Sequence, residues 1–101
     1  MFDAFRDLLL TVDPEATKNK GNGNENYTVW RPYGATGPHS NNRRKVRVWK
    51  IQVDRFTKTD NDTIALGILN ALEAAEIPHT YLIDYEKDTG YHHHIFDCEV
   101  V

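Results

Sequence analysis

Apolar residues recur at helical spacing in two stretches of the chain. Between residues 2 and 12 they return every three or four positions, with acids and an arginine between them, and Pro14 follows. This spacing predicts a short N-terminal helix with one apolar face. A longer apolar stripe begins after Asp60 and Asn61, either of which can cap a helix, and ends at Pro78. It predicts the long helix of the protein, with an apolar face formed by Ile64, Ile68, Leu69, Leu72 and Ala75.

Strand-like patterns lie between these helices. Residues 27–34, YTVWRPYG, are β-branched and aromatic, and we expect Pro32 to stop the ladder there. Residues 45–56, KVRVWKIQVDRF, alternate more clearly, but the apolar parity changes between Val48 and Trp49. Either both faces of this strand are partly covered, or a β-bulge lies between the two residues.

The last part of the chain predicts a β-hairpin. The stretch TYLIDYE is followed by the turn KDTG and by YHHHIFDCEVV. If the turn closes symmetrically, Tyr85 lies opposite His92 and Ile83 lies opposite His94. A bulge at Gly90 would shift the register by one residue and mix apolar with polar positions on each face, so we expect the symmetric pairing.

Together these elements predict one α+β domain over residues 1–101. We expect a roughly four-stranded mixed or antiparallel sheet with the long helix packed on one face, a short N-terminal helix and a C-terminal hairpin. Two polar segments rich in Asn, Gly, Lys or Pro, at about 14–26 and 35–44, have few large apolar side chains, and we expect them to be mobile loops.

Composition narrows the classes of function without selecting one. The net charge of −3 gives no global field that attracts nucleic acid or an anionic membrane. No apolar run is long enough to span a bilayer, and the acids near the N-terminus do not fit a secretory leader, so we expect no membrane contact and a cytosolic site of synthesis. The single cysteine, Cys98, excludes an internal disulfide and a cysteine-based zinc cluster.

Three consecutive histidines suggest a metal site, but their spacing argues against one. Along a strand, His92 and His94 share a face and His93 points the other way, so the three cannot hold one ion. A site on His92 and His94 would need a third ligand from elsewhere, and no spacing selects it. The alternative is that both are half-buried strand residues beside Tyr85, and we therefore expect no metal and no other cofactor.

Cys98 and the remaining motifs do not indicate catalysis. Cys98 has the parity of the apolar residues, where a cysteine is usually a small buried hydrophobe. The GNGNEN segment lacks the strand and helix that a phosphate loop requires, and no Ser–His–Asp arrangement is suggested by spacing. We expect a protein that is not an enzyme.

A basic cluster precedes the central strand. It comprises Arg43, Arg44, Lys45, Arg47 and Lys50, with Trp49 among them. Charges interleaved with an aromatic residue are typical of a single-strand nucleic-acid platform, so a small nucleic-acid-binding or regulatory module remains the alternative function. A solvated strand end with Trp49 in the core, or a subunit interface, would explain the same residues.

Two stretches resemble the tail-completion or tail-terminator proteins of long-tailed bacteriophages. In VWKIQVDRFTKTDNDTIALGILNALEAAEI, a strand of that family's form runs through a Thr/Asp-rich turn into an amphipathic helix. DYEKDTGYHHHIFDCEV is similar to the family's hairpin, and the resemblance covers most of residues 27–101. Arg55 departs from it, because an apolar residue is expected after QVD.

The resemblance implies a structural virion protein of a phage or prophage. Proteins of that family form rings, typically hexamers, that end the tail tube and join it to the head connector. It implies tail-tube and head-connector partners, a location in the neck of the virion after assembly in the bacterial cytoplasm, and passage of DNA through the ring. The segments 19–26 and 35–42 would become ordered at the interface. The candidate subunit contacts are Arg43, Arg44, Arg47, Trp49, Arg55 and His93.

Overall fold

The computed structural model describes residues 2–36 and 47–101. It confirms the α+β class, with two helices and a sheet that has five strands instead of the four expected. In chain order the elements are α1 (Asp3–Val12), β1 (Thr17–Lys18), β2 (Tyr27–Thr36), β3 (Val48–Thr57), α2 (Thr63–Ala74), β4 (His79–Glu86) and β5 (Tyr91–Val100).

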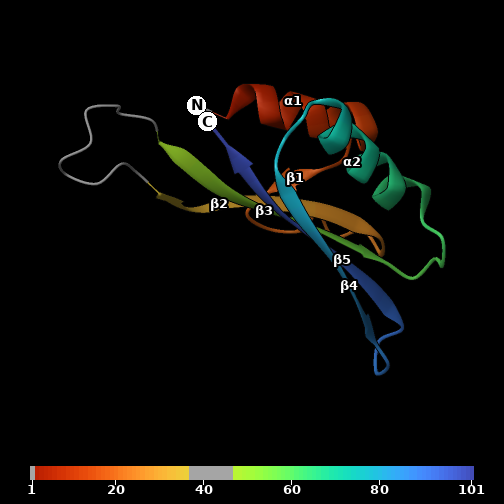
Figure 1. The fold of residues 1–101 in the computed structure, drawn as a ribbon. Coiled ribbons are helices and arrows are strands. Elements are labelled where there is room, and N and C mark those ends of the chain that lie inside the picture. Colours follow the sequence, from red (N-terminus) through yellow and green to blue (C-terminus); the bar gives the residue numbers. More distant parts are fainter. Residues whose placement is uncertain (1, 37–46) are drawn as a thin grey trace.

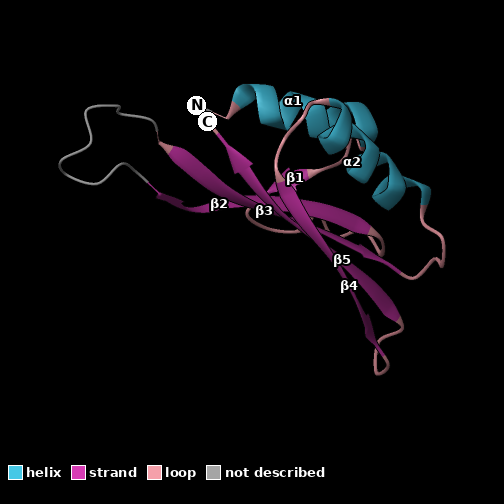
Figure 2. Ribbon diagram, in the orientation of Figure 1, coloured by secondary structure: helices cyan, strands magenta, loops and turns pink. Residues whose placement is uncertain are grey.

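The sheet is mixed and its strand order is β1-β2-β3-β5-β4. β1 pairs with β2 in parallel, and all other neighbours are antiparallel. Both helices lie on one face of the sheet, and the β4–β5 hairpin extends beyond them (Figures 1 and 2). The helices thus cover only part of that face, and within residues 2–36 and 47–101 the opposite face of the sheet carries no helix.

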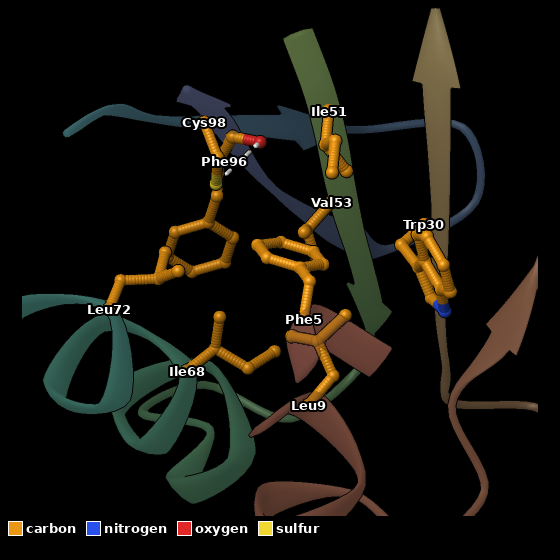
Figure 3. Packing of buried hydrophobic residues seen from close by; sticks show 9 residues of the cluster. All are labelled: Phe5, Leu9, Trp30, Ile51, Val53, Ile68, Leu72, Phe96 and Cys98. Atoms are coloured by element: carbon orange, nitrogen blue, oxygen red, sulfur yellow. Dashed lines mark hydrogen bonds between the residues drawn. The ribbon is translucent and has the colours of Figure 1, made fainter. Parts of the chain in front are cut away.

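The core lies between the helices and the middle of the sheet. Side chains of both helices meet those of β2, β3 and β5 there (Figure 3). Ile68 and Leu72 of α2 are fully buried against Phe96 of β5, as the helical stripe predicts. The buried apolar cluster is Phe5, Leu9, Trp30, Ile51, Val53, Ile68, Leu72, Phe96 and Cys98.

The two helices pack closely at Gly67. A Cβ atom at this position would lie 2.8 Å from Cγ1 of Val12, which is too short for two carbon atoms. The absence of a side chain at Gly67 therefore lets α1 approach α2 closely. This close packing explains why a glycine, which lowers helix stability, stands inside α2. The N-cap of α2 is Asp62, whose carboxylate accepts a hydrogen bond from the backbone N–H of Ala65 at 2.9 Å, so the prediction of Asp60 or Asn61 as the cap was wrong.

The first polar segment contains a strand that the sequence did not reveal. Thr17 and Lys18 pair with Val29 and Trp30 of β2. The backbone N–H of Asn19 also donates to the carbonyl oxygen of Trp30 at 2.9 Å. A two-residue strand of Thr and Lys has no alternating apolar pattern, and it forms because the edge of β2 offers free hydrogen-bonding groups.

Pro32 does not stop β2, contrary to the prediction. The carbonyl of Trp30 points to β1, and main-chain groups alternate in direction along a strand, so the nitrogen of Pro32 also faces away from β3. The missing N–H is therefore not needed for pairing with β3. The ladder continues to Thr36 after a register shift between Pro32 and Gly34.

The apolar positions of β3 change parity between Val48 and Trp49 without a β-bulge in β3 at that point. Val48 pairs with Thr36 and Trp49 pairs with Ala35, and the pairing with β5 is regular from Trp49 to Thr57. Val48 and Trp49 are both half-buried. Of the two alternatives, partial covering of both faces is the one that applies.

The symmetric register of the hairpin is confirmed. Tyr85 lies opposite His92, Ile83 opposite His94, and Tyr81 opposite Phe96. This register places the odd-numbered residues of β4 and the even-numbered residues of β5 on the face that carries the helices.

Candidate functional site

A groove lies between the N-terminal part of α2 and the β4–β5 hairpin. Its volume is about 320 Å³. It forms where the hairpin extends past α2, so that the helix covers one side of the strand surface only. The side chains and loop residues that line it are Thr59, Asp60, Asn61, Asp62, Thr63, Ala65, Leu66, Leu69, Tyr81, Ile83, His92 and His94.

The apolar part of the groove continues onto the open surface of β4. Leu82 is 65% exposed, Ile83 58% and Tyr85 53%, although β4 belongs to the sheet. Leu66 on α2, another large apolar side chain, is also exposed at the groove. Ile83, Tyr85 and Leu66 lie on the groove side, whereas Leu82, an even-numbered residue of β4, faces the other side of the sheet. Single exposed apolar residues are common, but several on one edge strand and beside a groove mark an interaction surface.

His94 and Tyr81 form a hydrogen-bonded pair at the inner end of the groove. Nδ1 of His94 lies 2.7 Å from the hydroxyl oxygen of Tyr81. Burial lowers the pKa of His94 and raises the pKa of Tyr81, so both are held in their uncharged forms. The pair can hydrogen-bond a ligand but carries no charge at neutral pH.

His92 lies beside Tyr85, as predicted, with ring centroids 4.9 Å apart. Among residues 2–36 and 47–101, no group of three or more His, Cys, Asp or Glu side chains is arranged to hold a metal ion. His92 and His94 therefore share the groove without a third ligand from the described part of the chain.

His93 points to the sheet face opposite α1 and α2. Its Nε2 lies 2.8 Å from a carboxylate oxygen of Asp54, and its ring stacks on Phe56 with centroids 4.0 Å apart. Tyr27 stacks on the other side of Phe56. This row of three rings crosses β2, β3 and β5 and holds the His93 ring against the sheet surface. The predicted contact of His93 with a neighbouring subunit stays a prediction.

Arg55 is buried and forms ion pairs within the chain. It is 4% exposed, and its Nε donates to a carboxylate oxygen of Asp62 at 2.9 Å. Its Nη1 lies 3.6 Å from Asp13, and the same atom donates to the Thr28 hydroxyl at 3.4 Å. The guanidinium thus ties β3 to the start of α2 and the end of α1. Because the Arg55 side chain is buried, it does not fit the predicted role of a subunit contact. Its ion pairs with Asp13 and Asp62 explain why an arginine stands where the tail-terminator pattern has an apolar residue.

The basic cluster falls partly outside the described residues. Arg43, Arg44 and Lys45 lie there, so their predicted contacts stay predictions. Arg47 lies over the ring of Trp49, at 5.7 Å from its centroid, and the ring of Phe2 meets Trp49 edge-on. Lys50 forms an ion pair with Glu99. Of the described part of this cluster, only Arg47 presents a positive charge beside an aromatic ring.

Cys98 is fully buried in the core. Burial raises the pKa of its thiol to about 12, with a smaller contribution from Asp97. A thiol this far from ionisation is a poor nucleophile, in keeping with the predicted role as a small buried hydrophobe.

Sequence reasoning missed the groove and the exposed part of β4. Its signal was the pair of adjacent apolar residues Leu82 and Ile83, which would face both sides of a strand and so would need cover on both. The alternation of Tyr81, Ile83 and Tyr85 indicates the hairpin register but does not show that β4 lacks cover.

No helix in the described ranges is long and apolar enough to cross a membrane. The sequence matches no protein-family model, and a search of curated proteins found no match.

Proposed function

We propose that this protein is a structural subunit of the neck of a long-tailed phage or prophage. Copies of it form a ring, with six subunits as the expected number, that ends the tail tube and joins it to the head connector. DNA passes through the ring, and the subunit works by shape and contact without catalysing a reaction. It is assembled in the bacterial cytoplasm and stays in the virion.

The observation that carries the proposal is the exposed apolar surface of β4 and the adjoining groove. Leu66, Leu82, Ile83 and Tyr85 are large apolar side chains that the chain itself leaves in water. Burying them against another protein is favourable by roughly 25 cal/mol for each Å² removed from water. The resemblance to tail-terminator proteins implies a ring, and in a ring such a surface would be buried between subunits or against another neck protein.

The nucleic-acid alternative has less support. Lys50 is neutralised by Glu99, and the ring of Trp49 is packed against Phe2 and Arg47. An aromatic stacking platform requires a free ring face, and the described residues of this cluster leave little of the Trp49 ring free.

The proposal is tested by the native mass of the protein, alone and after mixing with tail tubes from a tailed phage of the host that carries the gene. We expect a closed oligomer in at least one condition and, by electron microscopy, a ring at one end of the tube. A protein that stays monomeric at high concentration and does not bind tubes would overturn the proposal. Salt-dependent binding of single-stranded DNA by the monomer would instead support the alternative.

A further inference from the structure

The two edges of the sheet differ in how well they are protected from another chain. At the β2 edge, β1 covers part of the strand, and Pro32 has no N–H to offer where β1 ends. The register shift between Pro32 and Gly34 makes this edge still less regular. Both features hinder the addition of a further strand at β2.

The other edge, β4, has neither feature. The backbone N–H of Glu99 donates to the carbonyl of Pro78 at 2.9 Å, so the even-numbered residues of β4 direct their main-chain groups to β5. The main-chain groups of Tyr81, Ile83 and Tyr85 point outward, and among the described residues no strand lies beyond β4. β4 is regular over eight residues and contains no proline. It therefore offers a row of open N–H and C=O groups to an extended segment of another chain.

The side of β4 that faces the groove is apolar. Tyr81, Ile83 and Tyr85 project to this side, and Leu66 of α2 lines the groove beside them. The described residues include six exposed large apolar side chains, and three of them, Leu66, Ile83 and Tyr85, lie on this side. A segment that pairs with β4 places every second side chain on the same side. Apolar side chains at those positions would cover Ile83 and Tyr85 and reach the groove.

The opposite side of β4 is acidic. The even-numbered residues Asp84 and Glu86 project to this side, and Asp88 follows in the turn. Within the described residues, none of these three acids forms an ion pair. Lys87 is the only lysine or arginine between residues 59 and 90, so the acids outnumber it. Basic side chains on this side of an added segment would complement the charge of the hairpin.

We infer that β4 receives an extended segment of a partner protein as a sixth strand of the sheet, and that this segment alternates apolar with basic side chains. Its main chain pairs with Tyr81, Ile83 and Tyr85. Its apolar side chains face the groove, and its basic side chains lie beside Asp84 and Glu86. The source of the segment rests on the proposed function, because a neighbouring protein of the neck is what supplies it there.

Two other occupants fit this edge less well. A second copy that pairs through its own β4 brings the acids Asp84 and Glu86 of both hairpins together, and like charges on paired strands are destabilising. Nucleic acid brings its phosphates to the same acids. The charge of the hairpin therefore favours a basic peptide segment over either of them.

Hydrogen exchange measured by NMR at a concentration where the protein is monomeric gives the first test. The amide of Ile83 points outward and is expected to exchange at least roughly tenfold faster than the amides of Leu82 and Asp84, which are directed to β5. Equal protection of all three amides in the monomer would show that the edge is already paired and would overturn the inference. Protection of Ile83 that grows with protein concentration would assign the edge to a second copy and would also overturn it.

The probe for binding is a blocked octapeptide in which Lys or Arg alternates with Val or Ile. We expect it to bind the wild type and to shift the amide signals of Tyr81, Ile83 and Tyr85. The same peptide with Glu in place of each basic residue is expected to bind at least roughly tenfold more weakly.

Two further peptides test whether the main chain of the segment pairs with β4. Each carries one N-methyl group, on a central apolar residue in one peptide and on the neighbouring basic residue in the other. Successive N–H groups of a strand point to opposite sides, so one methyl group faces β4 and removes a hydrogen bond, while the other faces solvent. One of the two peptides is expected to bind at least roughly tenfold more weakly, and the other is expected to bind like the parent peptide.

Protein variants test the charge and the apolar contribution separately. Asp84→Lys with Glu86→Lys is expected to weaken binding of the basic peptide at least roughly tenfold. The matched control is Glu73→Lys with Glu76→Lys, two exposed acids near the end of α2 that give the same charge change, and it is expected to bind within about threefold of the wild type. Ile83→Ala is expected to weaken binding without a change of charge. All of these side chains are exposed or half-buried, so native circular dichroism is expected in each variant.

Three results would overturn the strand site: no binding of the basic peptide up to about 1 mM, equal binding of the basic and acidic peptides, or equal binding of the two N-methylated peptides. Rings on tail tubes, formed by a protein that does not bind the basic peptide, would overturn this contact and leave the proposed function standing. A protein that binds no tube and forms no ring, but binds the basic peptide through β4, would overturn the proposed function and support the strand site with another source for its segment.

Discussion

The same face of the same sheet is a core at one end and an open surface at the other. Under α1 and α2, the alternate residues Ile51 and Val53 of β3 and Phe96 of β5 are fully buried. On the hairpin, Ile83 and Tyr85 of β4 have the same alternation and face the same side, yet more than half of each side chain is exposed. The exposure differs because the helices pack over β3 and β5, whereas α2 does not extend over the hairpin beyond the groove (Figure 1).

This comparison separates two uses of an apolar strand face. Beneath the helices, apolar area removed from water stabilises the fold of the single chain. On the hairpin, the same kind of area contributes little to that fold and remains available for a partner. Substitutions in the two regions are therefore expected to differ in which measurement they change.

The largest effect is expected from Arg55, which holds the covered region together. Replacing it, as in Arg55→Met, leaves Asp62 and Asp13 buried without their cation. Breaking a buried ion pair in this way typically costs about 3–5 kcal/mol of unfolding free energy. Urea denaturation followed by fluorescence of the tryptophans would measure the loss.

A double variant is the control for this prediction. Asp62→Asn removes the charge while keeping a side chain that can cap α2. In Arg55→Met with Asp62→Asn, the combined loss should be smaller than the sum of the two single losses, because the two charges interact. Additive losses would contradict the assignment of the ion pair as the main contribution.

The next effect compares one isoleucine from each region. Ile68→Ala removes a fully buried side chain of α2 and is expected to lower the unfolding free energy by about 2–5 kcal/mol. Ile83→Ala removes an exposed side chain and is expected to change the stability of the monomer by less than about 0.5 kcal/mol. Both are measured by denaturation at a concentration where the protein is monomeric. Similar losses in the two variants would show that Ile83 stabilises the monomer as a core residue does. They would contradict the distinction between the covered region and the hairpin.

The smallest effect concerns His94, at the boundary of the two regions. Burial lowers its pKa below the ordinary 6.5, while Asp62 at the N-cap of α2 opposes this shift, and His92, Arg55 and His93 reinforce it. The unfolded chain therefore binds more protons near pH 6, so the unfolding free energy rises with pH in that range. The contribution is present above about pH 6.5 and is lost as the pH falls through the pKa of the folded state.

Denaturation at pH 7.5 and pH 5.5 would check this pH dependence. His94→Gln removes the titrating group and keeps a hydrogen-bonding side chain for Tyr81. The drop in stability on acidification should be smaller in the variant than in the wild type. An equal drop in both proteins would assign the pH dependence to other groups.

Much of the secondary structure could be predicted because local patterns decide it. The two apolar stripes give α1 and α2, and the turn between β4 and β5 gives the hairpin in its observed register. The failures share a cause. β1 and the continuation of β2 past Pro32 depend on which side of a strand has a neighbour, and no local pattern contains that information.

The candidate site was less predictable than the fold. The interface residues were chosen for charge and aromatic character, and this choice included Arg55, which is buried with two acids from distant parts of the sequence. The groove was missed because it needs α2 and the hairpin to lie side by side without full contact.

The sequence by itself determined the class of fold, the helices, the hairpin register and the opposite orientation of His93 from His92 and His94. These follow from periodicities of 3.6 and 2.0 residues, which are properties of the local backbone. Only the tertiary structure decided that Arg55 is internal, that His94 is hydrogen-bonded to Tyr81, and that Leu82, Ile83 and Tyr85 are left exposed. Burial depends on which element lies above a residue, and that is set by packing between segments far apart in the chain.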